Sequence, residues 1–120
     1  MSRTVMIVDD ALFMRNILRG IVVEKGYIVA AEAASGIEAM KNLHTHHPDI
    51  ILLDIILPDS NGLDLLQSIT ESYPQSKVVV CSAIGQEQVI QKALDLGAKA
   101  FLQKPFKPEK VIEVLERLEA

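Results

Sequence analysis

The sequence predicts an α/β fold in which a five-stranded parallel sheet is doubly wound, with helices on both of its faces. Short, β-branched apolar runs alternate five times with longer segments that have helical periodicity. The apolar runs are nearly continuous, as in strands that helices cover on both sides. Because such alternation implies right-handed βαβ crossovers, we expect a single (βα)5 domain over residues 1–120.

Each element has its own pattern. The expected strands are residues 5–8, 28–31, 50–53, 78–81 and 100–102. Between them, apolar residues recur every three or four positions, so each helix can dock on the sheet through one face. The expected core-facing stripe of the first helix is Phe13, Ile17, Ile21 and Val22. That of the last helix is Val111, Leu115 and Leu118.

Signals for helix ends agree with this alternation. Ser35, followed three residues later by Glu38, is a capping box that opens the second helix. Gly26 and Gly97 stand where glycines would end the first and fourth helices. Pro108 suits the first turn of the last helix.

Composition excludes several classes of protein. A chain of 120 residues that is 49% hydrophobic can bury one core and is not disordered. The net charge of -4 and the scattered Lys and Arg residues argue against nucleic acid and membrane surfaces as partners. No apolar run approaches the roughly 20 residues that span a bilayer, and the N-terminus lacks signal-peptide features. Cys81 is the only cysteine, so we expect a reducing, cytoplasmic location.

Polar residues follow four of the five expected strands, at the edge of the sheet where such folds bind ligands. They are Asp9 and Asp10, Asp54, Ser82 and Lys104. Three converging carboxylates repel one another, and a hard dication with oxygen ligands such as Mg²⁺ relieves that repulsion. A lone Asp at a strand end is more often a cap; the joint occurrence of all five residues is what favours a site.

These groups fit phosphoryl transfer, which requires positioned groups and charge neutralisation around a PO₃ unit. Asp54 is the candidate nucleophile, since it stands alone at its strand end and a carboxylate can form an acyl phosphate. Asp9 and Asp10 would hold the metal. Lys104 supplies a point charge for a phosphate, and Ser82 supplies a hydrogen-bond donor.

At these residues the chain resembles the receiver domains of two-component response regulators. The matching motifs, in order and spacing, are Val8-Asp9-Asp10, Leu53-Asp54, Pro58, Gly62, Ser82-Ala83 and Lys104-Pro105-Phe106. The resemblance extends from Val5 to about Leu118. It implies a flavodoxin-like sheet with strand order 2-1-3-4-5 and phosphorylation of Asp54 by a histidine kinase. The protein would be a phosphoacceptor with at most slow autophosphatase activity, not an enzyme.

The resemblance also implies a role for each site residue. The implied ligands of Mg²⁺ or Mn²⁺ are Asp10, Asp54 and the backbone carbonyl of Ile56, with Asp9 assisting. The implied contacts of the phosphoryl oxygens are Ser82 and Lys104. Phe101, three residues before the lysine, is the implied switch aromatic. Ile56 and Ile84 flank the approach of water to the phosphoacceptor in this family, and neither can hydrogen-bond a water. We therefore expect a long-lived phosphorylated state unless a partner phosphatase acts.

A narrower resemblance, carried by residues 9–15, 81–83 and 101–106, points to the chemotaxis branch of the family. It implies a monomer without an effector domain. It further implies docking on a target protein, such as the flagellar motor switch, through helix 4, strand 5 and helix 5. Ser at position 82 and Phe at position 101 depart from the commoner Thr and Tyr. A stand-alone phosphorelay intermediate, or a single-domain regulator of another pathway, is the alternative.

Three other classes compete. A flavodoxin-like FMN binder would hold phosphate after the first strand, where two aspartates here repel it. A phosphatase of the haloacid dehalogenase type needs a second Asp two residues after the nucleophile, and position 56 is Ile. A structural pseudo-receiver would not need an intact acidic cluster. His44, His46 and His47 precede Pro48 at an expected helix C-terminus, which the helix dipole explains better than zinc does.

Overall fold

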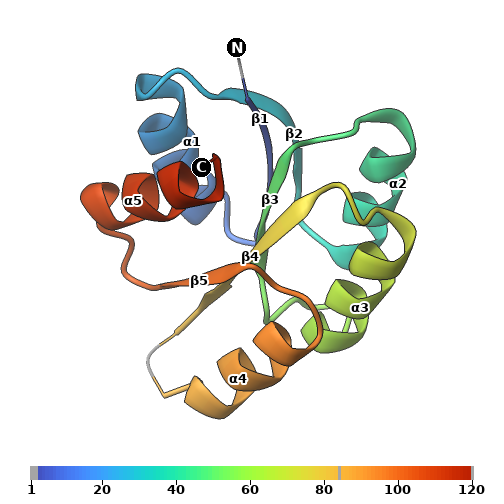
Figure 1. Cartoon of the computed structure of the whole chain (residues 1–120). Helices are drawn as coiled ribbons and strands as arrows, with labels where there is room; N and C mark the ends of the chain where they lie inside the picture. The colour runs from blue at the N-terminus through green and yellow to red at the C-terminus, as the bar shows by residue number, and fades with distance from the viewer. Residues whose placement is uncertain (1–2, 84, 120) are drawn as a thin grey trace.

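The computed structural model describes residues 3–83 and 85–119, in which five strands alternate with five helices (Figure 1). The strands are β1 (Thr4–Val8), β2 (Ile28–Ala33), β3 (Ile50–Asp54), β4 (Lys77–Ser82) and β5 (Ala100–Gln103). The helices are α1 (Leu12–Glu24), α2 (Gly36–Thr45), α3 (Gly62–Ser72), α4 (Glu87–Asp95) and α5 (Pro108–Glu119). Within these ranges no helix has both the length and the apolar character needed to cross a membrane.

All four strand pairings are parallel, and the order β2-β1-β3-β4-β5 confirms the predicted topology. The direction in which strands are added changes between β1 and β3, because β2 pairs with one edge of β1 and β3 pairs with the other. Asp54 is in register with Cys81, and Ser82 is in register with Gln103. The C-terminal ends of β3, β4 and β5 therefore lie level at one edge.

The sheet separates two apolar layers. Helices α1 and α5 cover one face, and α2, α3 and α4 cover the other (Figure 1). Because side chains alternate along a strand, Val5 and Ile7 pack on the α1/α5 side, whereas Met6 and Val8 pack on the opposite side. Burial on both faces explains why the central strands are continuously apolar.

Two expectations about burial need correction. The sequence predicts that all five strands are buried, and this prediction is wrong for β2 and β5. Ile28 and Phe101 are exposed there, because β2 and β5 are the edge strands of the sheet. The stripe expected on α1 is also wrong at Phe13, which is 73% exposed. The first turn of α1 begins at the edge of the sheet, and Leu18 and Val22 further along are the residues that are buried.

The predicted helix ends are confirmed. The Ser35 hydroxyl accepts a hydrogen bond from the Glu38 N–H at 3.1 Å, and the Glu38 carboxylate accepts one from the Ala34 N–H at 3.0 Å. Gly26 and Gly97 have φ angles of 92° and 112°, as glycines just beyond a helix C-terminus often do. Helix α5 begins at Pro108, α2 ends at Thr45 before the remaining histidines, and Val111 and Leu115 are buried.

Candidate functional site

The structure brings the five predicted polar residues to one edge of the sheet. Asp9 and Asp10 follow β1, Asp54 ends β3, Ser82 ends β4 and Lys104 follows β5. One carboxylate oxygen from each aspartate lies within 4.8 Å of the other two. In the described part of the chain, no other group of three or more His, Cys, Asp or Glu side chains has this metal-binding geometry.

The two buried aspartates are each held by a local backbone amide. Asp9 Oδ1 accepts a hydrogen bond from the Ala11 N–H at 2.9 Å, and Asp54 Oδ1 accepts one from the Ile56 N–H at 3.0 Å. The second oxygen of each carboxylate is left to face the cluster. Asp10, by contrast, is exposed, so the cluster opens toward solvent on its side.

Lys104 bridges the two buried carboxylates. Its Nζ donates to Asp54 Oδ2 at 3.0 Å and lies 3.2 Å from Asp9 Oδ2, at ion-pair distance but outside hydrogen-bond geometry. Burial by itself would lower the pKa of Lys104, but the hydrogen bond and charge of Asp54, and then the charge of nearby Asp9, raise the pKa overall. The lysine is therefore held as an ammonium. Its backbone N–H donates to the Ser82 carbonyl at 2.8 Å, which ties it to the end of β4.

Burial raises the pKa of Asp54, and the Ile56 N–H and Lys104 offset that rise only in part. Three carboxylates against one ammonium leave the cluster with a net charge of about -2 when all are ionised. A dication with a preference for oxygen ligands matches both this charge and the available atoms. The residues present therefore fit Mg²⁺ or Mn²⁺.

Ser82 is fully buried beside this cluster. Among the residues that the structure describes, its hydroxyl has no hydrogen-bond partner. A buried hydroxyl without a partner is costly, so its retention at a strand end favours a role in binding an oxygen of a ligand. The Ser82 hydroxyl and the Lys104 ammonium are therefore side-chain donors that can meet an anion at this site.

The loop after Asp54 is closely packed against the start of α3. Ile56 forms an isolated bridge with Asn61, whose side chain caps α3 by accepting from the Leu63 and Asp64 N–H groups. The Ile56 side chain is exposed, and its N–H is directed to Asp54. Coordination of a metal by the Ile56 carbonyl stays a prediction, and Ile84 lies outside the described residues.

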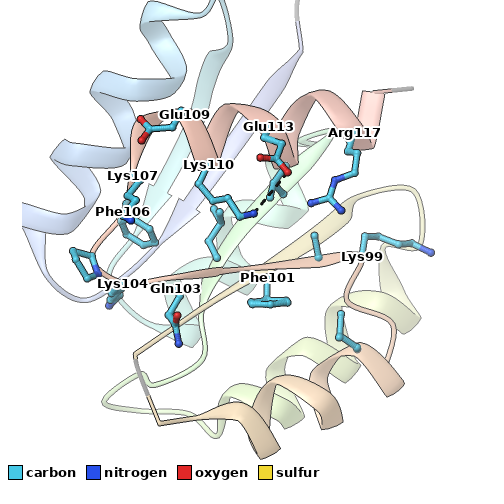
Figure 2. A pocket seen from close by; sticks show the side chains of 15 residues that line it. Lys99, Phe101, Gln103, Lys104, Phe106, Lys107, Glu109, Lys110, Glu113 and Arg117 are labelled. Carbon is cyan, nitrogen blue, oxygen red and sulfur yellow. Dashed lines mark ion pairs between the residues drawn. The ribbon is translucent and has the colours of Figure 1, made fainter.

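Phe101 lies away from the acidic cluster, on the exposed edge strand. It is 44% exposed and lines a hollow between β5, α4 and α5 (Figure 2). The basic residues lining this hollow, apart from Lys104, are Lys99, Lys107, Lys110 and Arg117. An aromatic residue in a strand usually packs in the core. Because Phe101 is exposed, packing in the core does not explain why an aromatic residue stands at this position.

Two polar contacts near the site were not predicted. The Arg15 guanidinium donates to the Asp9 carbonyl at 2.6 Å, and the Asp59 carboxylate accepts from the Gly36 and Ile37 N–H groups at 2.9 and 3.1 Å. Those two N–H groups lower the pKa of Asp59. Apart from its place in the motif of residues 9–15, Arg15 stands out in the sequence because it lies near the N-terminus of a helix, where the helix dipole disfavours a cation.

Comparisons with known proteins agree with this geometry. Residues 5–116 match the family described as the response regulator receiver domain. The chain is 43% identical over 118 residues to the chemotaxis protein CheY of Thermotoga maritima, covering 98% of both chains. It is 44% identical over 112 residues to that of Listeria monocytogenes, covering 93% of this chain and 94% of the other.

A CheY-like receiver domain from Methanospirillum hungatei has the same fold in its crystal structure. It aligns with a TM-score of 0.89 at 27% identity, covering 99% of this chain and 95% of that one. The family match spans nearly the whole sheet and includes every residue of the acidic cluster together with Ser82 and Lys104. By sequence and by structure, this chain belongs to the receiver domain family of response regulators and is similar to CheY.

Proposed function

We propose that this chain is a phosphorylation-activated switch that takes a phosphoryl group from a histidine kinase onto Asp54, with Mg²⁺ or Mn²⁺ as cofactor. The observation that carries the proposal is the convergence of three carboxylates, one lysine and a buried serine at the ends of four strands, the serine hydroxyl having no partner among the described residues. A receiver domain is a signalling protein rather than a classical enzyme, so the product of the reaction is the phosphorylated domain itself.

In the proposed transfer, an oxygen of ionised Asp54 attacks the phosphorus of a phosphohistidine. A P–O bond forms while the P–N bond breaks, and the histidine leaves with the electron pair. Lys104, which pairs with Asp54 Oδ2 before transfer, would instead contact a phosphoryl oxygen, and the Ser82 hydroxyl would donate to another. The bound dication supplies positive charge that neutralises the carboxylates and the incoming phosphoryl group.

The proposed metal ligands are Asp10, Asp54 and the Ile56 carbonyl, with Asp9 assisting. Asp10 supports this assignment because it is the exposed carboxylate of the cluster and Lys104 does not pair with it. Asp9 and Asp54 each share an oxygen with the lysine. Replacing Asp10 should therefore weaken Mg²⁺ binding more than replacing Asp9.

The test is phosphorylation by acetyl phosphate and Mg²⁺, read as a phosphoryl mass adduct and located by peptide mapping. Wild type should gain one adduct on Asp54, and Asp54→Asn should gain none. Asp59→Asn is the matched control, because Asp59 lies five residues further along the same loop and binds the first N–H groups of α2 without belonging to the acidic cluster. Labelling of Asp54→Asn at the wild-type level, or undiminished labelling in excess EDTA, would overturn the assignment.

The proposed output is docking on a target protein through α4, β5 and α5, and the similarity to CheY favours the flagellar motor switch. The exposed Phe101 and the lysine-rich hollow beside it support this surface. Phe101→Ala should phosphorylate normally but lose phosphorylation-dependent binding to a motor switch protein. Transfer of the phosphoryl group from Asp54 to a histidine phosphotransfer domain, with no binding to the motor protein, would favour a phosphorelay intermediate.

A further inference from the structure

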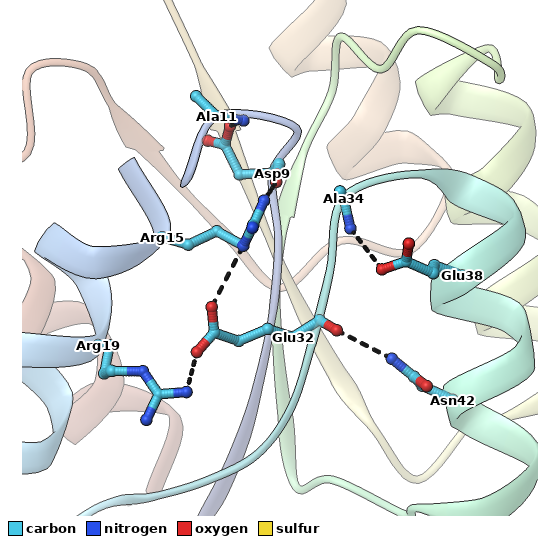
Figure 3. A network of polar contacts seen from close by, with 8 residues as sticks. All are labelled: Asp9, Ala11, Arg15, Arg19, Glu32, Ala34, Glu38 and Asn42. Carbon is cyan, nitrogen blue, oxygen red and sulfur yellow. Dashed lines mark hydrogen bonds and ion pairs between the residues drawn. The ribbon is translucent and has the colours of Figure 1, made fainter. Parts of the chain in front are cut away.

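A polar network joins the acidic cluster to the second strand. Arg15 in α1 donates from Nη1 to the Asp9 carbonyl at 2.6 Å and from Nε to Glu32 Oε1 at 3.2 Å (Figure 3). Arg19, one turn further along α1, pairs with the other carboxylate oxygen of Glu32. On the far side of β2, the Asn42 side chain donates to the Glu32 carbonyl at 3.0 Å. Glu32 is thus held from both faces of the sheet.

Arg15 is suited to this bridge because a guanidinium presents several donors in one plane, so one side chain can reach two acceptors at once. The Arg15 and Glu32 side chains are only 14% and 18% exposed. Water screens such a pair less than a surface pair, and hydrogen bonds between charged groups are stronger than neutral ones. The pair with Glu32 therefore holds the Arg15 guanidinium in place, and the guanidinium in turn holds the Asp9 carbonyl.

Arg15 binds the carbonyl of the Asp9–Asp10 peptide, whereas the N–H and the side chain of Asp9 are held by other groups. The Asp9 N–H already donates to the Ala33 carbonyl at 3.0 Å, and Asp9 Oδ1 already accepts from the Ala11 N–H. Because the peptide is planar, fixing its carbonyl also fixes the plane from which Asp10 begins. Asp10 is exposed and depends on this backbone for its direction.

We propose that Arg15 is a positioning residue for the metal site, holding the Asp9–Asp10 peptide so that the Asp10 carboxylate stays beside Asp9 and Asp54. This inference rests on the proposed function, because it concerns binding of the dication at that site. Glu32 anchors the guanidinium from β2 through Oε1, and Arg19 pairs with the other carboxylate oxygen without touching the cluster.

The sign of the effect separates positioning from simple charge. A cation near the site repels Mg²⁺, so charge alone predicts that removing Arg15 strengthens Mg²⁺ binding. Positioning predicts the reverse, since Asp10 loses its fixed direction. Loss of a residue that orients metal ligands typically weakens metal binding at least about tenfold. Arg19 provides the matched control, because it is also a cation of α1 paired with Glu32 but has no contact with Asp9.

The test is a Mg²⁺ titration followed by the amide NMR signals of residues 9–11, at a temperature where thermal melts show each variant folded. We expect Arg15→Ala to bind Mg²⁺ about tenfold more weakly than wild type. Arg15→Lys keeps the charge but cannot bridge both acceptors, so it should bind about threefold more weakly. Arg19→Ala should bind like wild type, with the Asp10 amide signal unmoved.

Equal or tighter Mg²⁺ binding by Arg15→Ala would overturn the inference while leaving the proposed function intact. Weakening of the same size in Arg19→Ala would also overturn it, because Arg19 has no contact with Asp9 and the effect would then not depend on that contact. Failure of the proposed function looks different: wild type itself would show no saturable Mg²⁺ binding, and Asp10→Asn would change nothing.

Discussion

Replacing Gly62 with alanine should destabilise the fold and displace the loop that carries the candidate site. Gly62 is the first residue of α3 and packs against the backbone just after Asp54. An alanine Cβ would lie 1.9 Å from the Ile55 carbonyl oxygen and 2.6 Å from its carbon. The helix and the loop would have to separate by about 1.5 Å to reach an ordinary contact of 3.4 Å.

The magnitude follows from what the new methyl group meets. Overpacking typically costs about 1–3 kcal/mol, and the obstacle here is backbone, which cannot rotate aside as a side chain can. We expect a loss of about 3 kcal/mol, which for a domain of this size lowers the melting temperature by roughly 10 °C. Because Ile55 lies between Asp54 and the amide that binds it, phosphorylation by acetyl phosphate should slow as well.

Two other glycines provide the controls. At Gly20, inside α1, an added Cβ meets nothing within 4 Å, so Gly20→Ala should stabilise the protein by up to about 1 kcal/mol. At Gly36 the Cβ meets the Ser60 hydroxyl oxygen, which can rotate away, and the Ser60 Cβ at 2.8 Å, which cannot, so Gly36→Ala should fall between the two. Urea and thermal unfolding measure all three. A Gly62→Ala protein within about 1 kcal/mol of wild type would refute the reasoning from this contact.

Three further predictions follow from the ionisable groups and from the rim of the site. Burial raises the pKa of Asp54, so its charge destabilises the metal-free fold: the contribution of this group is most favourable below pH 3.8 and is lost as the pH rises. Asp54→Asn should therefore melt above wild type at pH 7 without metal, whereas Mg²⁺ at about 100 times its Kd should stabilise wild type by about 2.7 kcal/mol and the variant far less. Burial, then the charge and hydrogen bond of Glu119, raise the pKa of Tyr27 to about 12, so its stabilising contribution is complete below pH 10 and is lost between pH 10 and about 12. Absorbance titration with Tyr27→Phe as reference should show this late ionisation. Ile56→Asn should shorten the lifetime of the phosphorylated protein by about tenfold, because the amide can orient water that isoleucine cannot, and an unchanged lifetime would show that this position does not control hydrolysis.

The sequence predicted the site better than it predicted the surface. A strand that is apolar until its last residue places the next polar group at a known edge of a parallel sheet, which is why the sequence alone could place Asp54 and Lys104 together. The pattern of one segment does not say which strands are central, so the exposure of Phe101 at an edge was missed. Nor does helical periodicity show where the sheet beneath a helix ends, and that is what exposes Phe13.

Arg15 was missed for a different reason. Its two acceptors, the Asp9 carbonyl and the Glu32 carboxylate, belong to segments that meet only after β1 and β2 have paired. A backbone carbonyl also leaves no trace in the identity of a residue, so no spacing rule could indicate the contact. Sequence patterns are therefore least able to predict the long-range contacts that side chains of a site make with main-chain atoms.

Lys104 connects the chemistry of the proposed site to its proposed output. Before transfer its ammonium lies between Asp9 and Asp54, and its backbone N–H holds the end of β5 to the Ser82 carbonyl. A phosphoryl group on Asp54 would offer new oxygens to both the ammonium and the Ser82 hydroxyl. These oxygens are negatively charged, so they can replace the carboxylates of Asp9 and Asp54 as partners of the ammonium. Because Lys104 directly follows β5, a shift of its main chain toward these oxygens would also move the strand on which Phe101 is exposed three residues earlier. An edge strand can move in this way at low cost, since it has hydrogen-bonded neighbours on only one side.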